Sequence, residues 1–280
     1  MTVSRQFADQ KVANTNSAQA WNPAHFQPTR VRTTDSRQTH RTEQVLRTAE
    51  AYGGQSATGI TIAGVSLLAD PSGALWHEEA RALVVADLHF EKGSAYAARG
   101  QFLPPYDTAA TLARLAALIL RYTPGLVIAL GDSFHDARAG ERMAACDYTA
   151  LNGLMQGRQW IWIAGNHDPV IPLGLGELQE EFEMGSLTFR HEPRQGDSNG
   201  EIAGHLHPAA RVVSPSGSLR RRCFISDGTR CILPAFGAFT GGLNIRDKAF
   251  AALFGGRPVL AHVLGRNRVY PVSARHCTGD

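Results

Sequence analysis

The sequence predicts an α/β fold whose first half is built on parallel β-strands. Three short apolar segments, residues 84–86, 125–130 and 159–164, have the length and residue types of buried strands. Helical patterns separate them: residues 107–122 place four large apolar side chains on one face, and roughly residues 140–155 form a second helix. Strands that alternate with helices in this way indicate a βαβαβ unit, in which the strands are parallel.

The folded domain is expected over residues 60–280, preceded by a disordered tail over residues 1–59. The tail is rich in Gln, Thr, Ser, Asn and Arg, and its apolar residues keep neither helical nor strand periodicity. A short helix near residues 43–51 fits the pattern. From Ile60 the segments ITIAGVSLLAD, ALWHEE and RALVVAD predict three strands. Beyond about Phe182 the predicted elements are short and mainly β.

Charge and cysteine content narrow the function classes. The tail holds seven Lys or Arg against four Asp or Glu, whereas residues 60–280 hold twenty-one of each, so the net charge of +3 comes from the tail. An overlong start assignment and a basic arm that grasps DNA would both account for such a tail.

The four cysteines form no CxxC pair, which predicts reduced thiols. With neither a signal-peptide pattern nor an apolar stretch of about 18 residues, we expect a cytoplasmic protein without a membrane partner.

Polar clusters follow each of the three predicted parallel strands. They are Asp87-Leu88-His89, Gly131-Asp132 and Gly165-Asn166-His167-Asp168. The carboxyl ends of strands are where α/β sheets build their sites. Asp87 and His89 are two residues apart, as are His205 and His207, so in extended backbone both side chains of each pair leave the same face. Glycines at 131, 165 and 204 allow sharp turns where a Cβ would crowd an ion or a phosphate.

The residue types in these clusters favour a pair of metal ions. Carboxylate, imidazole and amide oxygen ligands suit Mn, Fe or Zn better than Ca. Two such ions about 3.5–4 Å apart clamp a phosphate, activate a bridging water and stabilise an in-line displacement. Taken singly the motifs are weak, because DxH or GD is usually a turn or a helix cap, GNHD can be a turn, and GHLH can be an exposed strand. Together, in this order, they favour metal-dependent hydrolysis of phosphate esters.

The order DLH, GD, GNHD, a single His and GHLH resembles the calcineurin-like metallophosphoesterase superfamily over residues 60–280. Within it, the segments DLHFEKG (87–93), LPPYDT (103–108), HEP (191–193), PAFG (234–237) and GGL (241–243) are similar to the ligase-associated DNA damage response endonuclease family, PdeM. The resemblance implies a β-sandwich of two mixed sheets flanked by helices (α/β/β/α). It also implies a DNA endonuclease of DNA repair that uses two divalent ions, with Mn²⁺ expected ahead of Fe or Zn. A metal-bridging hydroxide would attack the phosphodiester, and a DNA ligase and a helicase would be functional partners.

Transferred residue by residue, the resemblance implies seven ligands: Asp87, His89 and His207 on one metal, Asn166, His191 and His205 on the other, and Asp132 as the bridge. His167 would then face the scissile phosphate, to stabilise the transition state or protonate the leaving oxygen, with Asp168 orienting it. His135 resembles a second phosphate-facing histidine of nuclease branches, and equally fits a residue that hydrogen-bonds to a ligand from behind. For His191, which few neighbouring signals mark, the alternative is a solvated histidine at a strand end.

The sequence leaves three functions open. A nuclease can follow a nucleic-acid backbone with Arg220, Arg221, Arg222 and the basic tail, although an Arg run can equally protect an edge strand from pairing. A small-molecule phosphodiesterase or nucleotide pyrophosphatase would use the same dimetal site in a narrower cleft. An interaction module that has lost its metals is the third, and the complete ligand set argues against it. Pro104-Pro105-Tyr106 and the glycines at 237, 241 and 242 are expected to be turns of the fold. The oligomeric state is left open.

Overall fold

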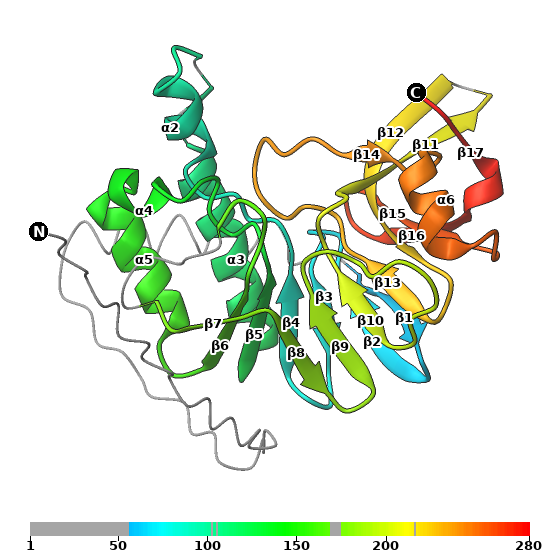
Figure 1. Cartoon of the computed structure of the whole chain (residues 1–280), viewed down its shortest axis with the longest axis horizontal. Coiled ribbons are helices and arrows are strands. Elements are labelled where there is room, and N and C mark those ends of the chain that lie inside the picture. The colour runs from blue at the N-terminus through cyan, green and yellow to red at the C-terminus, as the bar shows by residue number, and fades with distance from the viewer. Residues whose placement is uncertain (1–55, 102, 105, 169–174, 216) are drawn as a thin grey trace, which may run out of the picture.

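The structure, a computed structural model, describes residues 56–280 apart from 102, 105, 169–174 and 216. The expected tail lies outside the described residues as far as residue 55, and so does the short helix expected near residues 43–51. Strand β1 begins at Thr58, two residues before the expected start of the folded domain. In the described part of the chain, two mixed sheets pack face to face with helices on their outer faces (Figure 1).

The first sheet has seven strands in sequence order. The antiparallel part consists of β1 (Thr58–Ile62), β2 (Val65–Ala69), β3 (Leu75–His77) and β4 (Ala82–Val85). From β4 onward the strands are parallel, with β5 (Leu126–Leu130), β6 (Gln159–Ile163) and β7 (Glu177–Gln179). The crossovers contain α2 (Lys92–Ala97), α3 (Asp107–Tyr122), α4 (Ala139–Arg142) and α5 (Ala145–Met155). The βαβαβ unit predicted from the sequence is confirmed.

The second sheet is also mixed and follows the order β14-β11-β12-β13-β10-β9-β8, with β15 and β16 joined to β12, and β17 joined to β11. Its strands are β8 (Glu181–Met184), β9 (Leu187–Arg190), β10 (Glu201–Ala203), β11 (Pro208–Ser214), β12 (Gly217–Ser226), β13 (Arg230–Ile232), β14 (Leu243–Asn244), β15 (Leu260–Leu264), β16 (Val269–Ser273) and β17 (Cys277–Thr278). Helix α6 (Lys248–Phe254) and the 3-10 helix η2 (Ala274–His276) complete this half.

The layers follow from the alternation of side chains along each strand. Val84 belongs to the core between the two sheets, where it is joined by Phe189 and Phe224 of the second sheet. Its neighbour Val85 points to the other face and belongs to the core under α3. A third core lies between the second sheet and α6. The α/β/β/α sandwich implied by the resemblance is therefore the observed fold.

The expected strand ITIAGVSLLAD is in fact a hairpin. The chain reverses at Ala63 and Gly64, whose φ angles of 48° and 82° are both positive, as in the tight turns that suit the twist of two paired strands. The Ala-Gly pair within an apolar run was the available signal, because glycine tolerates positive φ. The reversal adds one strand to the antiparallel edge and leaves the positions of β4, β5 and β6 unchanged.

The second expected helix is broken, and two helices were missed. The backbone of Met143 is extended between α4 and α5, and its side chain is buried. Helix α6 carries a recognisable start, since the side chain of Asp247 accepts a hydrogen bond from the Ala249 N–H, and Gly255 ends it with a φ of 54°. Helix α2 has only six residues and no side-chain cap, so neither periodicity nor a capping residue predicted it. No helix of the described residues is long and apolar enough to cross a membrane.

Candidate metal centre

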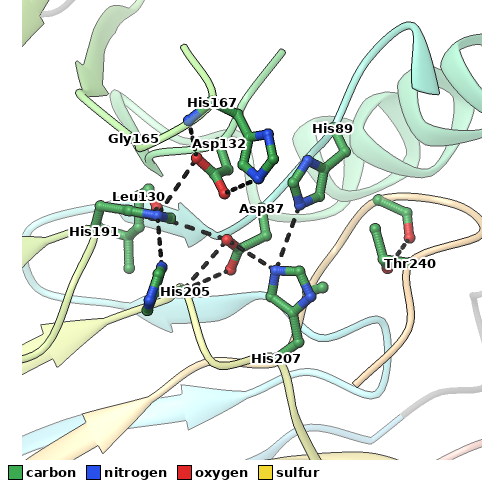
Figure 2. Close-up of polar contacts among 12 residues, drawn as sticks. Asp87, His89, Leu130, Asp132, Gly165, His167, His191, His205, His207 and Thr240 are labelled. Atoms are coloured by element: carbon green, nitrogen blue, oxygen red, sulfur yellow. Dashed lines mark hydrogen bonds and ion pairs between the residues drawn. The ribbon is translucent and has the colours of Figure 1, made fainter. Parts of the chain in front are cut away.

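The seven proposed ligands follow strands of both sheets, and Figure 2 labels all of them except Asn166. The first sheet provides the residues that follow β4, β5 and β6, and the second sheet provides those that follow β9 and β10. Contacts of 3.8 Å or less link all seven into one connected group: Asp87, His89, Asp132, Asn166, His191, His205 and His207. The structure therefore brings together every residue that the sequence proposed as a ligand.

The ligand loops do not have the extended backbone that we expected. Asp87 and His89 have φ angles of 53° and 45°, and His205 and His207 have φ angles of 70° and 46°. Asp87 and His89 still come together, but through left-handed turns instead of strand alternation, whereas the side chains of His205 and His207 lie in different halves of the centre. Five of the ten non-glycine residues with positive φ in the described chain are proposed ligands, the fifth being Asp132. Such conformations are costly for residues with a Cβ and cluster at functional sites.

One half of the centre consists of Asp87, His89 and His207. The Nε2 atom of His207 lies 3.1 Å from Oδ1 of Asp87 and 3.5 Å from Nε2 of His89. Burial, together with His207 and other nearby cationic groups, lowers the pKa of His89 to about 2, which keeps it in the neutral form that binds metals. Burial also acts to lower the pKa of His207, but the hydrogen bond and charge of Asp87 outweigh it and raise that pKa. A cation between these groups would take the place of the proton.

The other half consists of Asp132, His191, His205 and Asn166. Nε2 of His191 lies 3.4 Å from Oδ1 of Asp132 and 3.2 Å from Nδ1 of His205. Asn166 joins them through Nδ2, which is 3.4 Å from the same His205 nitrogen. His191 is buried, so the alternative of a solvated strand-end histidine is wrong. Burial and the neighbouring His191 lower the pKa of His205, which also favours the metal-binding form.

Three glycines make room for these ligands, as the sequence predicted. A Cβ at Gly131 would lie 2.5 Å from the His191 ring, and the φ of Gly131 is 69°. A Cβ at Gly165 would lie 2.1 Å from the backbone N of Asp132, and one at Gly204 would lie 2.7 Å from Oδ2 of Asp87. Any side chain at these positions would displace a proposed ligand.

His167 lies beside the ligands and is more exposed than Asp132, His89 and His191. Its side chain is 51% exposed, and its Nε2 lies 3.8 Å from Oδ2 of Asp132. The His167 ring stacks on the ring of His135 at 5.6 Å, and both rings lie 5.5 Å from that of His89. Two further imidazoles therefore border the centre. Within the described residues, the buried Nδ1 of His135 has no hydrogen-bond partner, so the structure gives no support to a role in which His135 hydrogen-bonds to a ligand.

Asp168 holds two site loops together. Its Oδ2 accepts hydrogen bonds from the backbone N–H groups of Ser133 and Phe134, at 2.7 and 3.0 Å, and its Oδ1 accepts one from Gly165 at 3.2 Å. Burial raises its pKa to about 6, against the effect of these hydrogen bonds. Its contacts thus tie the loop after β5 to the loop after β6. Direct orientation of His167 by this carboxylate stays a prediction.

Sequence reasoning missed Lys92 and Tyr96 of α2. The ammonium group of Lys92 lies 5.9 Å from the centre of the Tyr96 ring, and that ring lies 5.7 Å from His135. The positive charge of Lys92 contributes to lowering the pKa values of both His89 and His135. Lys92 lies within the DLHFEKG segment, and Tyr96 follows three residues after its end. Their short separation from His89 in the sequence was the signal that could have placed them near the site. They add a cation and an aromatic ring to the border of the site.

The donor set fits a pair of divalent cations. Within the described residues, two groups offer ligand atoms that all lie within 4.8 Å of one another: Asp87, His89 and His207, and Asp87, Asp132 and His191. The carboxylate that the two groups share is Asp87, whereas the resemblance gives the bridging position to Asp132, and that assignment stays a prediction. Among the described residues, the buried Nδ1 of His89 has no hydrogen-bond partner. Its Nε2 lies 3.5 Å from Nε2 of His207, so both rings present a nitrogen to the same point, as two ligands of one ion would.

Fold and site together define a metal-dependent hydrolase of phosphate esters. The family model for calcineurin-like phosphoesterases matches residues 80–230, which is more than half of the chain, and the chain belongs to this family. Among solved structures, it is similar to the nuclease MPE of Pseudomonas putida, with 29% identity and a TM-score of 0.59 over 78% of this chain and 100% of that one. The chain matches no curated protein.

Proposed function

We propose that the chain is a metal-dependent nuclease that cleaves DNA phosphodiesters internally. The observation that carries this proposal is the convergence of seven ligands beside an exposed histidine, His167. Four of the ligands are buried, Asp87, His89, Asp132 and His191, whereas Asn166 and His167 are exposed. The centre is therefore open to solvent on this side, so a long substrate can reach it without entering the protein. Similarity to a protein described as a nuclease supports a nucleic acid over other phosphodiesters. The other candidate, a small-molecule phosphodiesterase or nucleotide pyrophosphatase, uses the same residues.

The roles of the residues follow from their positions. One ion would be held by Asp87, His89 and His207, and the other by Asn166, His191 and His205. Asp132 would bind both ions. When bound, the two ions would supply positive charge to the phosphate and activate the attacking water. His167 is placed to donate a proton to the leaving oxygen or to stabilise the charge of the transition state. Lys92 adds positive charge on the side of His89 and His135, where an anionic substrate would gain from it.

Finer assignments are proposed on the resemblance of DLHFEKG, LPPYDT and the glycine motifs to the PdeM family. They are Mn²⁺ as the working metal, a cytoplasmic role in DNA repair, and functional association with a DNA ligase and a helicase. The arginines of β12 support DNA contact only in part. Nε of Arg220 lies 3.0 Å from a carboxylate oxygen of Asp280, which neutralises it, whereas Arg221 is exposed. Surface arginines of this kind add affinity through counterion release.

The test is a gel assay of the purified chain on supercoiled plasmid and single-stranded DNA. Mn²⁺, Mg²⁺ and Zn²⁺ are each added after chelation, and nucleotides and bis-p-nitrophenyl phosphate are assayed in parallel. We expect nicked and linear plasmid with Mn²⁺, no cleavage with chelator, and cleavage slowed by at least about a hundredfold with His167→Ala. Intact plasmid and intact single strands, together with rapid turnover of nucleotides, would favour the small-molecule candidate instead.

A further inference from the structure

The charge of the folded chain is divided unevenly along the sequence. Residues 60–204 hold ten Lys or Arg against eighteen Asp or Glu, whereas residues 205–280 hold eleven against three. The basic segment begins at the ligands His205 and His207 and continues through β11 to β17. Such a division of charge favours an anionic partner for the basic segment, and the nucleic acid of the proposed function is one.

The hairpin of β11 and β12 carries part of this positive charge away from the metal centre. Strand β11 begins at Pro208, directly after the ligand His207, and Figure 1 shows the hairpin extending beyond the rest of the second sheet. Its outer half is open to solvent: residues 217–221 of β12 are all exposed, whereas residues 223–226 are buried. A long substrate bound at the metal centre can therefore continue along the hairpin.

Two arginines face each other across this hairpin. Arg211 and Arg220 are directly opposite in the register of β11 and β12, so both side chains lie on the same face. Like charges that are directly opposite destabilise a pair of strands, and an anion between them removes the repulsion. Arg211 lies four residues beyond His207, or about 13 Å along an extended strand. The two arginines thus form a place for an anion at some distance from the metal centre.

In the structure, the carboxylate of Asp280 is the anion at this place. Its Oδ1 lies 3.0 Å from Nε of Arg220 and accepts a second hydrogen bond, also of 3.0 Å, from Nδ2 of Asn244. Nη1 of Arg211 donates to the carbonyl of the preceding residue, Gly279, at 3.3 Å. Hydrogen bonds from Asn244 and Arg220, together with the charges of both arginines, lower the pKa of Asp280, so its carboxylate stays ionised.

The ion pair between Arg220 and Asp280 is exposed, with 41% and 55% of the two side chains accessible to solvent. An exposed ion pair is weak, so another anion can replace the carboxylate. Arg220 also contacts a loop that packs on a metal ligand: its Nη2 donates to the carbonyl of Gly242, and a Cβ at Gly242 would lie 2.6 Å from the carbonyl oxygen of His207. The arginine pair is therefore connected to the metal centre through a single loop.

We propose that Arg211 and Arg220 bind a backbone phosphate of the nucleic acid a few nucleotides from the cut, and that Asp280 occupies this phosphate site until the substrate displaces it. This inference rests on the proposed nuclease function. It adds a contact outside the metal centre and a group of the chain itself that competes for that contact. A phosphate accepts hydrogen bonds from the same guanidinium donors as a carboxylate. Removal of the Asp280 charge should then strengthen substrate binding, which the loss of a purely structural ion pair would not do.

The experiment changes one charge at a time on the two sides of this contact. A labelled oligonucleotide is cleaved with Mn²⁺ at several salt concentrations, and KM and kcat are measured for wild type, Asp280→Asn and Arg220→Gln. Asp280→Asn should lower KM about two- to fivefold, the range expected when one exposed ion pair no longer competes. Arg220→Gln should raise KM at least about threefold and reduce the slope of log KM against log salt by about one, because one phosphate contact is lost. Both effects should fall on KM and not on kcat, because neither residue is among the proposed ligands.

Three further variants separate a phosphate site from a general effect of charge or folding. Asp197→Asn removes a carboxylate that is 98% exposed and lies 3.6 Å from Arg257, and it should leave KM unchanged. Arg220→Lys keeps the positive charge and should restore the salt slope of wild type. The double variant of Arg220→Gln and Asp280→Asn should resemble Arg220→Gln alone, because the gain from Asp280→Asn depends on the arginine. Melting temperatures report whether each variant is folded.

The outcomes are distinguishable. If wild type cleaves DNA and Asp280→Asn leaves KM unchanged or raises it, the contact of Asp280 with Arg220 is only structural, and the phosphate site is overturned while the nuclease function stands. A gain of the same size in Asp197→Asn, or one that persists in the double variant, would also overturn it, because the effect would then come from net charge alone. If wild type cleaves no DNA with any metal, the proposed function fails and this inference fails with it.

Discussion

His191 lies with its Nδ1 atom 2.9 Å from the carbonyl oxygen of Leu130, the last residue of β5. A carbonyl only accepts hydrogen bonds, so Nδ1 carries the proton, and Nε2 is left with its lone pair facing Asp132. A backbone group of one sheet thus fixes the tautomer of a ligand that follows a strand of the other sheet. This is the arrangement in which a histidine binds a metal most effectively.

His191→Ala should therefore remove metal capacity. We expect metal analysis after dialysis against Mn²⁺ to fall from about two equivalents toward one, with kcat/KM reduced by at least about a hundredfold, the upper range for the loss of a ligand-orienting contact. His262→Ala is the matched control, because His262 is another buried histidine and lies on β15 outside the site. Full metal content in the His191 variant would show that this residue is not a ligand.

His167→Ala separates catalysis from metal binding. The His167 side chain is exposed and its Nε2 is 3.8 Å from Asp132, so its removal should leave both ions in place while turnover falls about 10²- to 10⁴-fold. Asp132→Ala, by contrast, should lose both metal and turnover, because Asp132 is buried among the ligands. Metal content and kcat are measured on the same samples. Equal metal loss in the two variants would contradict the assigned roles.

Gly131→Ala tests the space beside the ligands. The added Cβ would lie 2.5 Å from the His191 ring, and the φ of 69° costs an alanine about 1 kcal/mol or more. We expect weaker metal binding in calorimetric titration and a lower melting temperature. Gly153→Ala in α5 is the control: its Cβ would meet nothing within 4 Å, and alanine favours helices, so stability should rise by up to about 1 kcal/mol. Normal metal affinity in the Gly131 variant would mean that the His191 ring can move aside without loss.

The sequence predicted the first half of the fold and the site for the same physical reason. Buried parallel strands are continuous apolar runs, and each of β4, β5 and β6 ends at a conspicuous polar motif. His191 and the pair His205 and His207 came from the resemblance and from short motifs, because the strands before them have only three or four residues. The left-handed backbone of the ligand loops could not be foreseen, since only glycine adopts positive φ freely and Asp and His do so too seldom for their presence to predict it.

Other features depend on contacts between distant segments. The contacts of Asp168 with Ser133 and Phe134 join residues about 35 positions apart. The motif GNHD suggested that Asp168 orients His167. In the structure, the Asp168 carboxylate accepts hydrogen bonds from backbone N–H groups of the loop after β5. Local spacing does not distinguish these two uses of an aspartate.

Glu201 should be important for stability. It is fully buried, with one carboxylate oxygen 3.1 Å from Nε of the buried Arg230 and the other 3.4 Å from Nε of Arg190. Glu201→Ala leaves Arg230 buried without its counterion, so we expect a loss of about 3–5 kcal/mol in the free energy of unfolding, measured with urea. Asp197→Ala is the control, because its side chain is 98% exposed and lies 3.6 Å from Arg257. A loss under about 1 kcal/mol for the Glu201 variant would show that solvent reaches Arg230.

Asp227 makes stability depend on acid pH. Its burial acts to raise its pKa, but hydrogen bonds from Arg230 and Thr229 and the charge of Arg257 outweigh this and hold the pKa below its ordinary value of 3.8. A pKa that is lower in the folded state means that the unfolded chain binds protons more readily, so the stabilisation is complete above about pH 5 and is lost as the pH falls through the folded pKa.

The difference in unfolding free energy between wild type and Asp227→Asn should therefore be largest at pH 7 and shrink steadily below pH 4. Glu141→Gln, which removes an exposed carboxylate paired with Arg138, should show a small difference at every pH. If the difference for Asp227→Asn stays constant from pH 7 to pH 3, the ionised carboxylate is not what stabilises the turn between β12 and β13.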